Sequence, residues 1–403
     1  MGYRGSKSDL KYKSVKEQRV DGSWLLNKLA VPVRSLRCTL MGFERNYQVK
    51  IPAKQLFNRT YSTNLKEQTM NPWFLSGFAD AESSFILSIF KNEKSKLKWR
   101  VSPYFSIHIH IKDIALLKLI QISLGVGKVR KNSENTAVFR VDKLQEIQVI
   151  IDNFKKYPLV SAKHSDFLLF EAAYNLIKQK EHLTVAGLEK VLALRYNLNK
   201  GLPVDIKFAF PNVVPVLRPE YKFNGIPDPF WVSGFVSGDS TFCVSIEKSN
   251  NKLGQRVRLI FGTCLHIRDK HLLIGMADYF KNLNFNVNNS SLCLRPRPWG
   301  QASLITSASS LQLQAEANTK DISVHCSESN DKALLQFKSK FYIENKVVPF
   351  FNLYPVLGVK RLDFEDFKTV SELVTNKEHL NAKGLLKILK IAEGMNLSRK
   401  YKV

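Results

Sequence analysis

Hydrophobic and polar positions follow the same order of patterns twice along this 403-residue chain. The segments 71–82 and 228–239 each begin with a capping residue and a proline and continue with apolar and small residues, which predicts a helix. After each segment, apolar and polar residues alternate, which indicates half-buried antiparallel strands. Helical spacing then returns. Each half is therefore predicted to follow the order α-β-β-α-β-β-α.

The two faces of the predicted strands differ in chemistry. In the first half, apolar residues share the expected core face: Trp99, Val101, Phe105, Ile107 and Ile109. The opposite face carries Lys98, Arg100, Ser102, Tyr104, Ser106, His108 and His110. The polar positions of the second half include Ser245, Lys248, Arg256, Arg258 and Cys264. Such faces fit either a solvated surface or a surface for nucleic acid, and the basic character of the chain favours nucleic acid.

Further segments repeat in register, which indicates an internal duplication. His110–Asp113 matches His266–Asp269 at an offset of 156 residues, and Tyr157–Lys163 matches Tyr354–Lys360 at an offset of 197. The larger second offset places an insertion in the second copy, in the polar, serine-rich stretch 294–332. A stretch of this composition is expected to form a long loop.

The repeats divide the chain into four parts. These are residues 1–70, a first half at 71–198, a linker at 199–227 and a second half at 228–403. Residues 1–70 hold 14 Lys and Arg against 5 Asp and Glu, a net charge of +9. We expect a basic, poorly ordered leader, and a transit peptide is a second interpretation of the same composition.

One acid stands at the C-terminal end of each predicted motif helix, Glu82 in the first and Asp239 in the second. The helix dipole disfavours negative charge at that end. A divalent cation would compensate for it, because hard cations take oxygen ligands. Small residues such as Gly77 and Gly234 would let the two helices approach closely, so that each half supplies one carboxylate.

Charge and cysteine content limit the classes of partner. Lys and Arg exceed Asp and Glu by 61 to 35, a formal net charge of +26, which predicts a polyanionic partner. Charge alone would also fit binding to a ribosome or a membrane surface. The 5 cysteines are scattered without a CxxC pair, so neither a disulfide framework nor a zinc site is indicated. No apolar run approaches about 18 residues, so no membrane-spanning helix is expected.

Two segments resemble a known motif. Leu75-Ser-Gly-Phe-Ala-Asp-Ala-Glu-Ser83 and Val232-Ser-Gly-Phe-Val-Ser-Gly-Asp-Ser240 resemble the LAGLIDADG motif. The chain from Asn71 onward, about four-fifths of the sequence, resembles a single-chain LAGLIDADG homing endonuclease encoded in fungal mitochondrial introns. The resemblance implies an α+β fold of two pseudo-symmetric halves, with saddle-shaped antiparallel sheets. It also implies that the two motif helices form the central interface.

The resemblance further implies a function and a set of site residues. The expected activity is site-specific cleavage of double-stranded DNA with Mg²⁺, which Glu82 and Asp239 would bind. Lys163 and Lys360 match the active-site lysines of the family, although from the pattern alone each could be a surface lysine. The implied DNA-contacting residues are Lys98, Arg100, Ser102, Ser106, His108, Ser245, Lys248, Arg256 and Arg258. The expected protein is a mitochondrial monomer that acts on a long asymmetric site and has no membrane association.

The sequence departs from the family pattern at four positions. Ser83 and Ser240 stand where the motif has glycine, and a side chain there is expected to crowd the turn from helix to strand. Asp239 is shorter than the usual glutamate, and Leu265 replaces a glutamine found in many relatives. These changes favour an alternative function, in which a maturase or other degenerate relative binds intron RNA without cleaving DNA.

Overall fold

The computed structural model describes residues 69–199, 201–283, 322–327, 331–396 and 399. All of these lie in one compact unit, residues 54–403. The predicted leader up to residue 68 lies outside the described residues, and so do residues 284–321 of the second half. Cys38 and Cys293 lie outside them as well.

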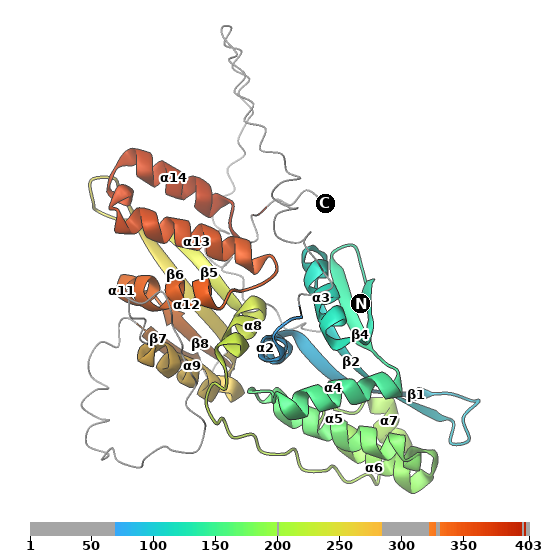
Figure 1. Cartoon of the computed structure of the whole chain (residues 1–403). Coiled ribbons are helices and arrows are strands. Elements are labelled where there is room, and N and C mark those ends of the chain that lie inside the picture. The colour runs from blue at the N-terminus through green and yellow to red at the C-terminus, as the bar shows by residue number, and fades with distance from the viewer. Residues whose placement is uncertain (1–68, 200, 284–321, 328–330, 397–398, 400–403) are drawn as a thin grey trace, which may run out of the picture. The chain divides into compact units, whose positions relative to one another are not determined.

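The first half follows the predicted order and adds helices after it (Figure 1). Its elements are α2 (Pro72–Glu82), β1 (Ser83–Lys91), β2 (Trp99–His110), the 3₁₀ turn η2 (Ile111–Asp113), α3 (Ile114–Leu124), β3 (Lys128–Lys131), β4 (Thr136–Val141), α4 (Leu144–Lys156), α5 (Lys163–Lys178), η3 (Glu181–Leu183) and α6 (Val185–Tyr196). A short helix, α7 (Val204–Ala209), lies in the segment predicted as a linker.

The second half repeats this order. Its elements are α8 (Pro229–Asp239), β5 (Ser240–Lys248), β6 (Gln255–His266), η4 (Ile267–Asp269), α9 (Lys270–Asn282), β7 (Ile322–Ser327), β8 (Lys332–Phe337), α11 (Lys340–Tyr342), the π-helical segment η6 (Ile343–Val347), α12 (Val348–Leu353), α13 (Lys360–Thr375), η7 (Glu378–Leu380) and α14 (Ala382–Glu393). Segments α11, η6 and α12 follow one another without a gap. Together they take the place in the second half that α4 has in the first half.

Each half contains one antiparallel four-stranded sheet. The strand orders are β1-β2-β4-β3 and β5-β6-β8-β7, so the two sheets have the same topology. Strand β7 lies within the stretch that the sequence analysis assigned to a long loop, and that expectation is wrong for residues 322–327. Ile322 and Val324 alternate with polar residues and pack against the core of the second half, which is why this segment pairs with β8.

Both motif helices begin at the predicted capping residues. Asn71 accepts a hydrogen bond from the backbone N–H of Trp73 at 2.8 Å, and Asp228 accepts one from the N–H of Phe230 at 2.7 Å. Proline occupies the first helical position in each case, where its missing N–H costs no intrahelical bond. The helices end at Glu82 and Asp239 because the next residue already has extended backbone angles.

Helices α2 and α8 pack directly against each other (Figure 1), as the small residues predicted. A Cβ atom on Gly77 would lie 1.9 Å from the carbonyl oxygen of Trp231. A Cβ atom on Gly234 would lie 2.0 Å from the carbonyl oxygen of Phe74. Since no atom can approach a backbone oxygen so closely, only glycine permits this helix separation at either position.

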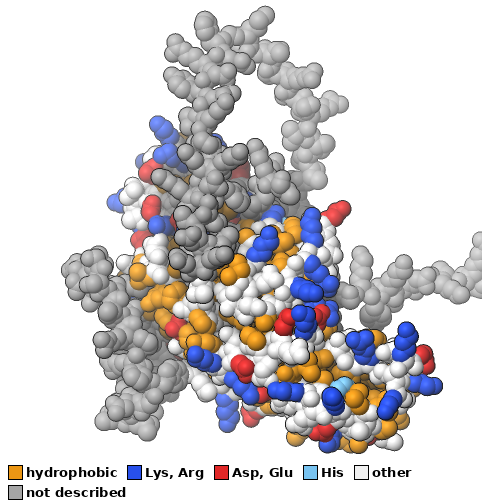
Figure 2. Space-filling model, turned by 45° about the vertical axis from the view of Figure 1, so that its right-hand side comes forward, with side chains coloured by type: hydrophobic (Ala, Val, Ile, Leu, Met, Phe, Trp, Pro, Cys, Tyr) orange, Lys and Arg blue, Asp and Glu red, His pale blue; other side chains and the backbone are white. Residues whose placement is uncertain are grey.

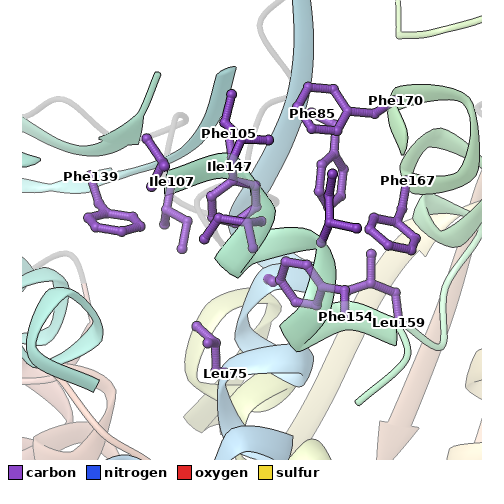
Figure 3. Packing of buried hydrophobic residues seen from close by; sticks show 14 of the residues in the cluster. Leu75, Phe85, Phe105, Ile107, Phe139, Ile147, Phe154, Leu159, Phe167 and Phe170 are labelled. Atoms are coloured by element: carbon purple, nitrogen blue, oxygen red, sulfur yellow. The ribbon is translucent and has the colours of Figure 1, made fainter. Parts of the chain in front are cut away.

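Each half buries an aromatic core of its own. In the first half Phe85 contacts Phe105, Phe154, Phe167 and Phe170, with ring centroids 5.2 to 5.7 Å apart, and Figure 3 shows these rings turned toward one another. The second half repeats the arrangement around Phe242, which contacts Phe261, Phe351, Phe364 and Phe367. These cores fix the first strand of each sheet and therefore the acid that precedes it. None of the helices that the structure describes is long and apolar enough to cross a membrane.

Candidate active site

The two predicted metal-binding acids lie where the motif helices end. Glu82 is the last residue of α2 and Asp239 the last of α8, and both are partly buried. A Cβ atom on Gly238 would lie 2.4 Å from the Cβ of Ala81 and 3.6 Å from Oε1 of Glu82. The carboxylate of Glu82 therefore lies against the residue that precedes Asp239. The close packing of two glycine-containing helices brings these C-terminal ends together.

A predicted lysine lies beside each helix end. The Nζ atom of Lys163 donates hydrogen bonds to the carbonyl oxygens of Ala79 at 3.1 Å and Ala81 at 3.5 Å. In the second half the Nζ atom of Lys360 donates to the carbonyl oxygen of Ser240. The last carbonyls of a helix have no partner within the helix and carry its negative dipole end. The ammonium group of Lys163 therefore offsets negative charge at the end of α2, and that of Lys360 lies at the first residue after α8.

The donor set at this point fits a hard divalent cation. Within the described ranges, no group of three or more His, Cys, Asp or Glu side chains could hold a metal ion on its own. Two carboxylates are nevertheless the usual protein contribution to Mg²⁺, which keeps several waters and takes further oxygen ligands from substrate phosphates. Gly238 lets α8 approach Glu82 closely, because a Cβ atom there would lie 3.0 Å from the Cγ of Glu82.

The two serines that replace the motif glycines do not strain the backbone. Ser83 has φ −90° and ψ 163°, and Ser240 has φ −113° and ψ 166°, angles that any residue adopts. Ser83 donates its hydroxyl to the carbonyl oxygen of Ala79 at 2.6 Å, and the Ser240 and Thr263 hydroxyls share a hydrogen bond of 2.5 Å. The prediction that these side chains crowd the turn is therefore wrong, since the strand begins directly after the helix without a left-handed residue.

Leu265 is a partly buried residue of strand β6. It pairs with Ala333 in the ladder between β6 and β8, and its side chain packs against the core of the second half. The matching residue of the first half is Ile109, which is buried in the core of that half. An apolar residue at this position is thus a shared feature of both strands.

Asp80, the sixth motif residue of α2, is buried and joins the two halves. It accepts hydrogen bonds from the N–H groups of Val160 at 2.7 Å and Ser161 at 3.1 Å, from the Ser161 hydroxyl at 2.6 Å, and from the indole N–H of Trp231 at 2.8 Å. Burial raises the pKa of Asp80, and these hydrogen bonds oppose the rise. The sequence analysis did not predict this network, because its partners lie 80 to 151 positions from Asp80 along the chain.

The predicted DNA-contacting residues lie on or beside the two sheets. Lys98, Arg100, His108, Lys248 and Arg256 are exposed, and Ser102, Ser245 and Arg258 are partly exposed. Ser106 is the exception. It is fully buried (0% exposed), because the neighbouring strands cover its small side chain, so its predicted contact with DNA is not supported.

The sequence analysis missed basic residues on the neighbouring strands of the first sheet. Lys128 and Arg140 stand opposite each other in the ladder between β3 and β4, and Arg140 is also opposite Ser106 of β2. The guanidinium of Arg140 lies 3.7 Å from the ring centre of Tyr104. Burial, followed by Arg130 and Arg140, lowers the pKa of His108. The run Lys128–Lys131 is too short for alternation to identify a strand, although its charge could have marked it.

The polar face of the second sheet is less basic. Arg258 forms an ion pair with Glu247 on the neighbouring strand at 3.2 Å, which offsets its charge. Cys264 occupies the position that His108 has in the first half, and burial together with the nearby charge of Asp239 raises the pKa of its thiol. Figure 2 shows Lys and Arg side chains spread over the described surface of the molecule on the side that it presents.

Comparison with known proteins agrees with this fold. The family model described as LAGLIDADG endonuclease matches residues 75–174 and 232–296. A Neurospora crassa relative named probable intron-encoded endonuclease 3 is 32% identical over 404 aligned positions, which cover 96% of this chain and 68% of that relative.

Two solved structures extend the comparison. The LAGLIDADG meganuclease I-CpaMI bound to uncleaved DNA is 38% identical, with a TM-score of 0.70, and the match covers 81% of this chain and 99% of that one. I-SmaMI bound to uncleaved target DNA in the presence of calcium ions is 32% identical, with a TM-score of 0.70 and coverage of 81% and 99%.

The chain therefore belongs to the LAGLIDADG endonuclease family, a class of DNA-cleaving hydrolases. One motif lies in each half, so the predicted family and the predicted α+β fold of two pseudo-symmetric halves are confirmed.

Proposed function

We propose that this chain is an intron-encoded homing endonuclease that hydrolyses one phosphodiester bond in each strand of a long asymmetric DNA site. The observation that carries the proposal is the pairing of an acid and a lysine at the end of each motif helix. Lys163 contacts the last turn of the helix that ends at Glu82, and Lys360 contacts the residue that follows Asp239. Two such pairs in one chain match a reaction with two scissile bonds, and they support a protein that acts as a monomer.

Glu82 and Asp239 would together hold Mg²⁺. A bound Mg²⁺ lowers the pKa of coordinated water and stabilises the leaving 3′ oxygen. The ammonium groups of Lys163 and Lys360 would donate to the phosphoryl oxygens as negative charge develops on them, or would orient the attacking water. The hydrogen bonds that the lysines already make support this role, because Lys163 bonds to carbonyls of the last turn of α2 and Lys360 to the carbonyl of the residue that follows Asp239.

Recognition of the DNA would come from the polar faces of the two sheets. The proposed contacts are the predicted residues other than Ser106, together with Lys128, Arg130 and Arg140 of the first sheet. Arginine and lysine on such a face can bind phosphates or the edges of guanine. Since the two faces carry different side chains, the two halves of the site should differ in sequence.

The relatives support an origin in a fungal mitochondrial intron, and we propose mitochondria as the site of action. The alternative function, RNA binding by a maturase without cleavage, rested largely on Ser83, Ser240 and Leu265. With the two serines unstrained and Leu265 in the core, that argument no longer favours it.

The proposal is tested by incubating the purified chain with DNA that contains the intron-free sequence of the host gene. Staggered cutting at one position, dependent on Mg²⁺ and abolished by a chelator, is the expected result. Intact DNA together with tight binding of intron RNA would contradict it.

Metal binding is measured separately by thermal unfolding. Mg²⁺ should raise the Tm of the unaltered chain and of a surface control, Asp278→Asn, but should leave the Tm of Glu82→Gln unchanged. An equal rise in all three proteins would exclude Glu82 as a ligand.

A further inference from the structure

Two aspartates at matching positions of the repeat have no part in the site described so far. Asp113 ends the 3₁₀ turn η2 and is the N-cap residue of α3, while Asp269 ends η4 and is the N-cap residue of α9. An aspartate at this position ordinarily accepts a hydrogen bond from an N–H group in the first turn of its own helix. Among the described residues, neither aspartate makes that cap bond.

Each carboxylate instead reaches the opposite half. Asp269 of the second half accepts a hydrogen bond from the N–H of Ala162 in the first half, at 2.7 Å. Asp113 of the first half accepts one from the N–H of Val359 in the second half, at 2.6 Å. The two contacts are equivalent under the duplication, and each crosses the boundary between the halves.

The residues that receive these contacts directly precede the two lysines. Ala162 and Val359 are the N-cap residues of α5 and α13, which begin at Lys163 and Lys360. Alanine and valine are poor caps because their side chains offer no acceptor. The aspartate of the other half accepts instead from the N–H of the N-cap residue itself, and it places a negative charge at the N-terminal end of the helix, which the helix dipole favours.

We propose that Asp113 and Asp269 are positioning residues that act across the two halves. Asp269 sets the start of α5 and thereby the amine of Lys163, and Asp113 does the same for α13 and Lys360. The inference rests on the proposed roles of the two lysines. It couples each half of the active site to the correct docking of the other half.

The contacts of Asp269 with Ala162 and of Asp113 with Val359 should contribute unequally to the position of the lysines. The loop before Lys163 also donates hydrogen bonds to Asp80. Its carbonyl groups accept two more, at Ala162 from Arg218 at 2.9 Å and at Val160 from the Tyr221 hydroxyl. The loop before Lys360 is held by Asp113 and by Ser237. Loss of Asp113 should therefore displace its lysine further than loss of Asp269.

The test measures cleavage of each DNA strand separately, under single turnover, on a duplex with a different label on each strand. Lys163→Ala and Lys360→Ala first show which strand depends on which lysine. Asp269→Ala should then slow the strand that depends on Lys163, and Asp113→Ala the strand that depends on Lys360. The expected loss is about 10- to 100-fold, as misplacement of a catalytic group by about 1 Å costs about 100-fold.

Two kinds of control separate positioning from general damage. Asp113→Asn and Asp269→Asn keep an acceptor oxygen and should restore most of the lost rate on the affected strand. Asp278→Ala removes an exposed carboxylate of α9 and should leave both strands unaffected.

A variant at Gly358 tests the contact between Asp113 and Val359 from the second half, should Asp113→Ala fail to fold. A Cβ atom on Gly358 would lie 2.4 Å from Oδ1 of Asp113, and φ there is +71°. Gly358→Ala should therefore slow the same strand as Lys360→Ala.

Either of two results would overturn the inference. Equal slowing of both strands by each aspartate variant, with strand-selective lysine variants, would leave only a structural role for the aspartates. Lysine variants without any strand preference would remove the proposed lysine roles and this inference with them.

Discussion

The loops before Lys163 and Lys360 are equivalent in the two halves, but different side chains hold them in place. In the first half the buried carboxylate of Asp80 accepts from Val160, from Ser161 and from the indole of Trp231. At the matching place in the second half, the Ser237 hydroxyl accepts from the N–H of Leu357 at 3.0 Å. The backbone hydrogen bond that holds the loop was kept after duplication, while the acceptor changed from a carboxylate to a hydroxyl.

The side-chain donors around Asp80 have no equivalents around Ser237. Trp231 donates to Asp80, and the residue that corresponds to Trp231 in α2 is Phe74, which has no N–H to donate. Ser161 adds a hydroxyl to Asp80, and its counterpart is Gly358. A buried carboxylate requires several donors, and Asp80 has them from its own half and from Trp231 of the other half. The comparison shows that an acid ends the motif helix in both halves, whereas the motif position two residues earlier differs between them.

The largest effect on the helix interface should come from the glycines that both halves retain. Gly77→Ala and Gly234→Ala each place a Cβ atom within about 2 Å of a backbone oxygen, which forces α2 and α8 apart. We expect about 3 kcal/mol of lost unfolding free energy for either variant, measured by urea denaturation. Gly394→Ala is the control, because its Cβ atom would meet no atom closer than 3.4 Å. Unchanged stability of Gly77→Ala would contradict the described contact.

The acceptors that differ between the halves should differ in their contribution to stability. Asp80→Ala leaves buried donors of Val160, Ser161 and Trp231 without a partner and should cost about 3 kcal/mol. Ser237→Ala leaves the single donor of Leu357 and should cost about 1 kcal/mol. Urea denaturation of both variants gives the two values. Equal losses would show that the extra donors around Asp80 add nothing.

The charge of Asp80 should also appear in the pH dependence of stability. Burial raises the pKa of Asp80 in the folded state, so the folded chain holds this proton more tightly than the unfolded chain does. The stability that this group contributes is therefore present below the unfolded pKa of about 3.9 and is lost as pH rises toward the folded pKa. Asn at this position stays neutral. The unfolding free energy of the unaltered chain relative to Asp80→Asn should thus fall over that window, and a rise would mean that the hydrogen bonds outweigh burial.

The smallest expected effect concerns the polar faces of the two sheets. Each phosphate contact that is lost should reduce the slope of log K against log salt by about 0.9. Arg130→Ala in the first sheet should show this change, whereas Arg258→Ala should show less of it, because Arg258 is already paired with Glu247. Binding titrations at several salt concentrations measure both slopes. Equal changes would mean that the ion pair opens when DNA binds.

Sequence patterns predicted the parts of the fold that depend on neighbouring residues. The bounds of the motif helices followed from Asn71 and Asp228 with their prolines, and the core face of β2 followed from alternation. The close helix contact followed from Gly77 and Gly234, because only small residues permit it.

Contacts between distant residues could not be predicted in this way. The partner of Asp113 lies 246 positions along the chain, and the indole that donates to Asp80 lies 151 positions away. Strand β7 was assigned to a loop because its serine-rich surroundings obscured the alternation of Ile322 and Val324. The burial of Ser106 depends on the strands beside it, which a single-strand pattern does not describe.

The most direct test of the central claim, that each half supplies one acid to a shared active site, is single-turnover cleavage by Glu82→Gln and Asp239→Asn at saturating protein. Each variant should bind the target as tightly as the unaltered chain and cleave it at least about 100- to 1,000-fold more slowly. Glu393→Gln, an exposed acid on α14, should cleave at the normal rate. Cleavage at the normal rate by either Glu82→Gln or Asp239→Asn would contradict the account.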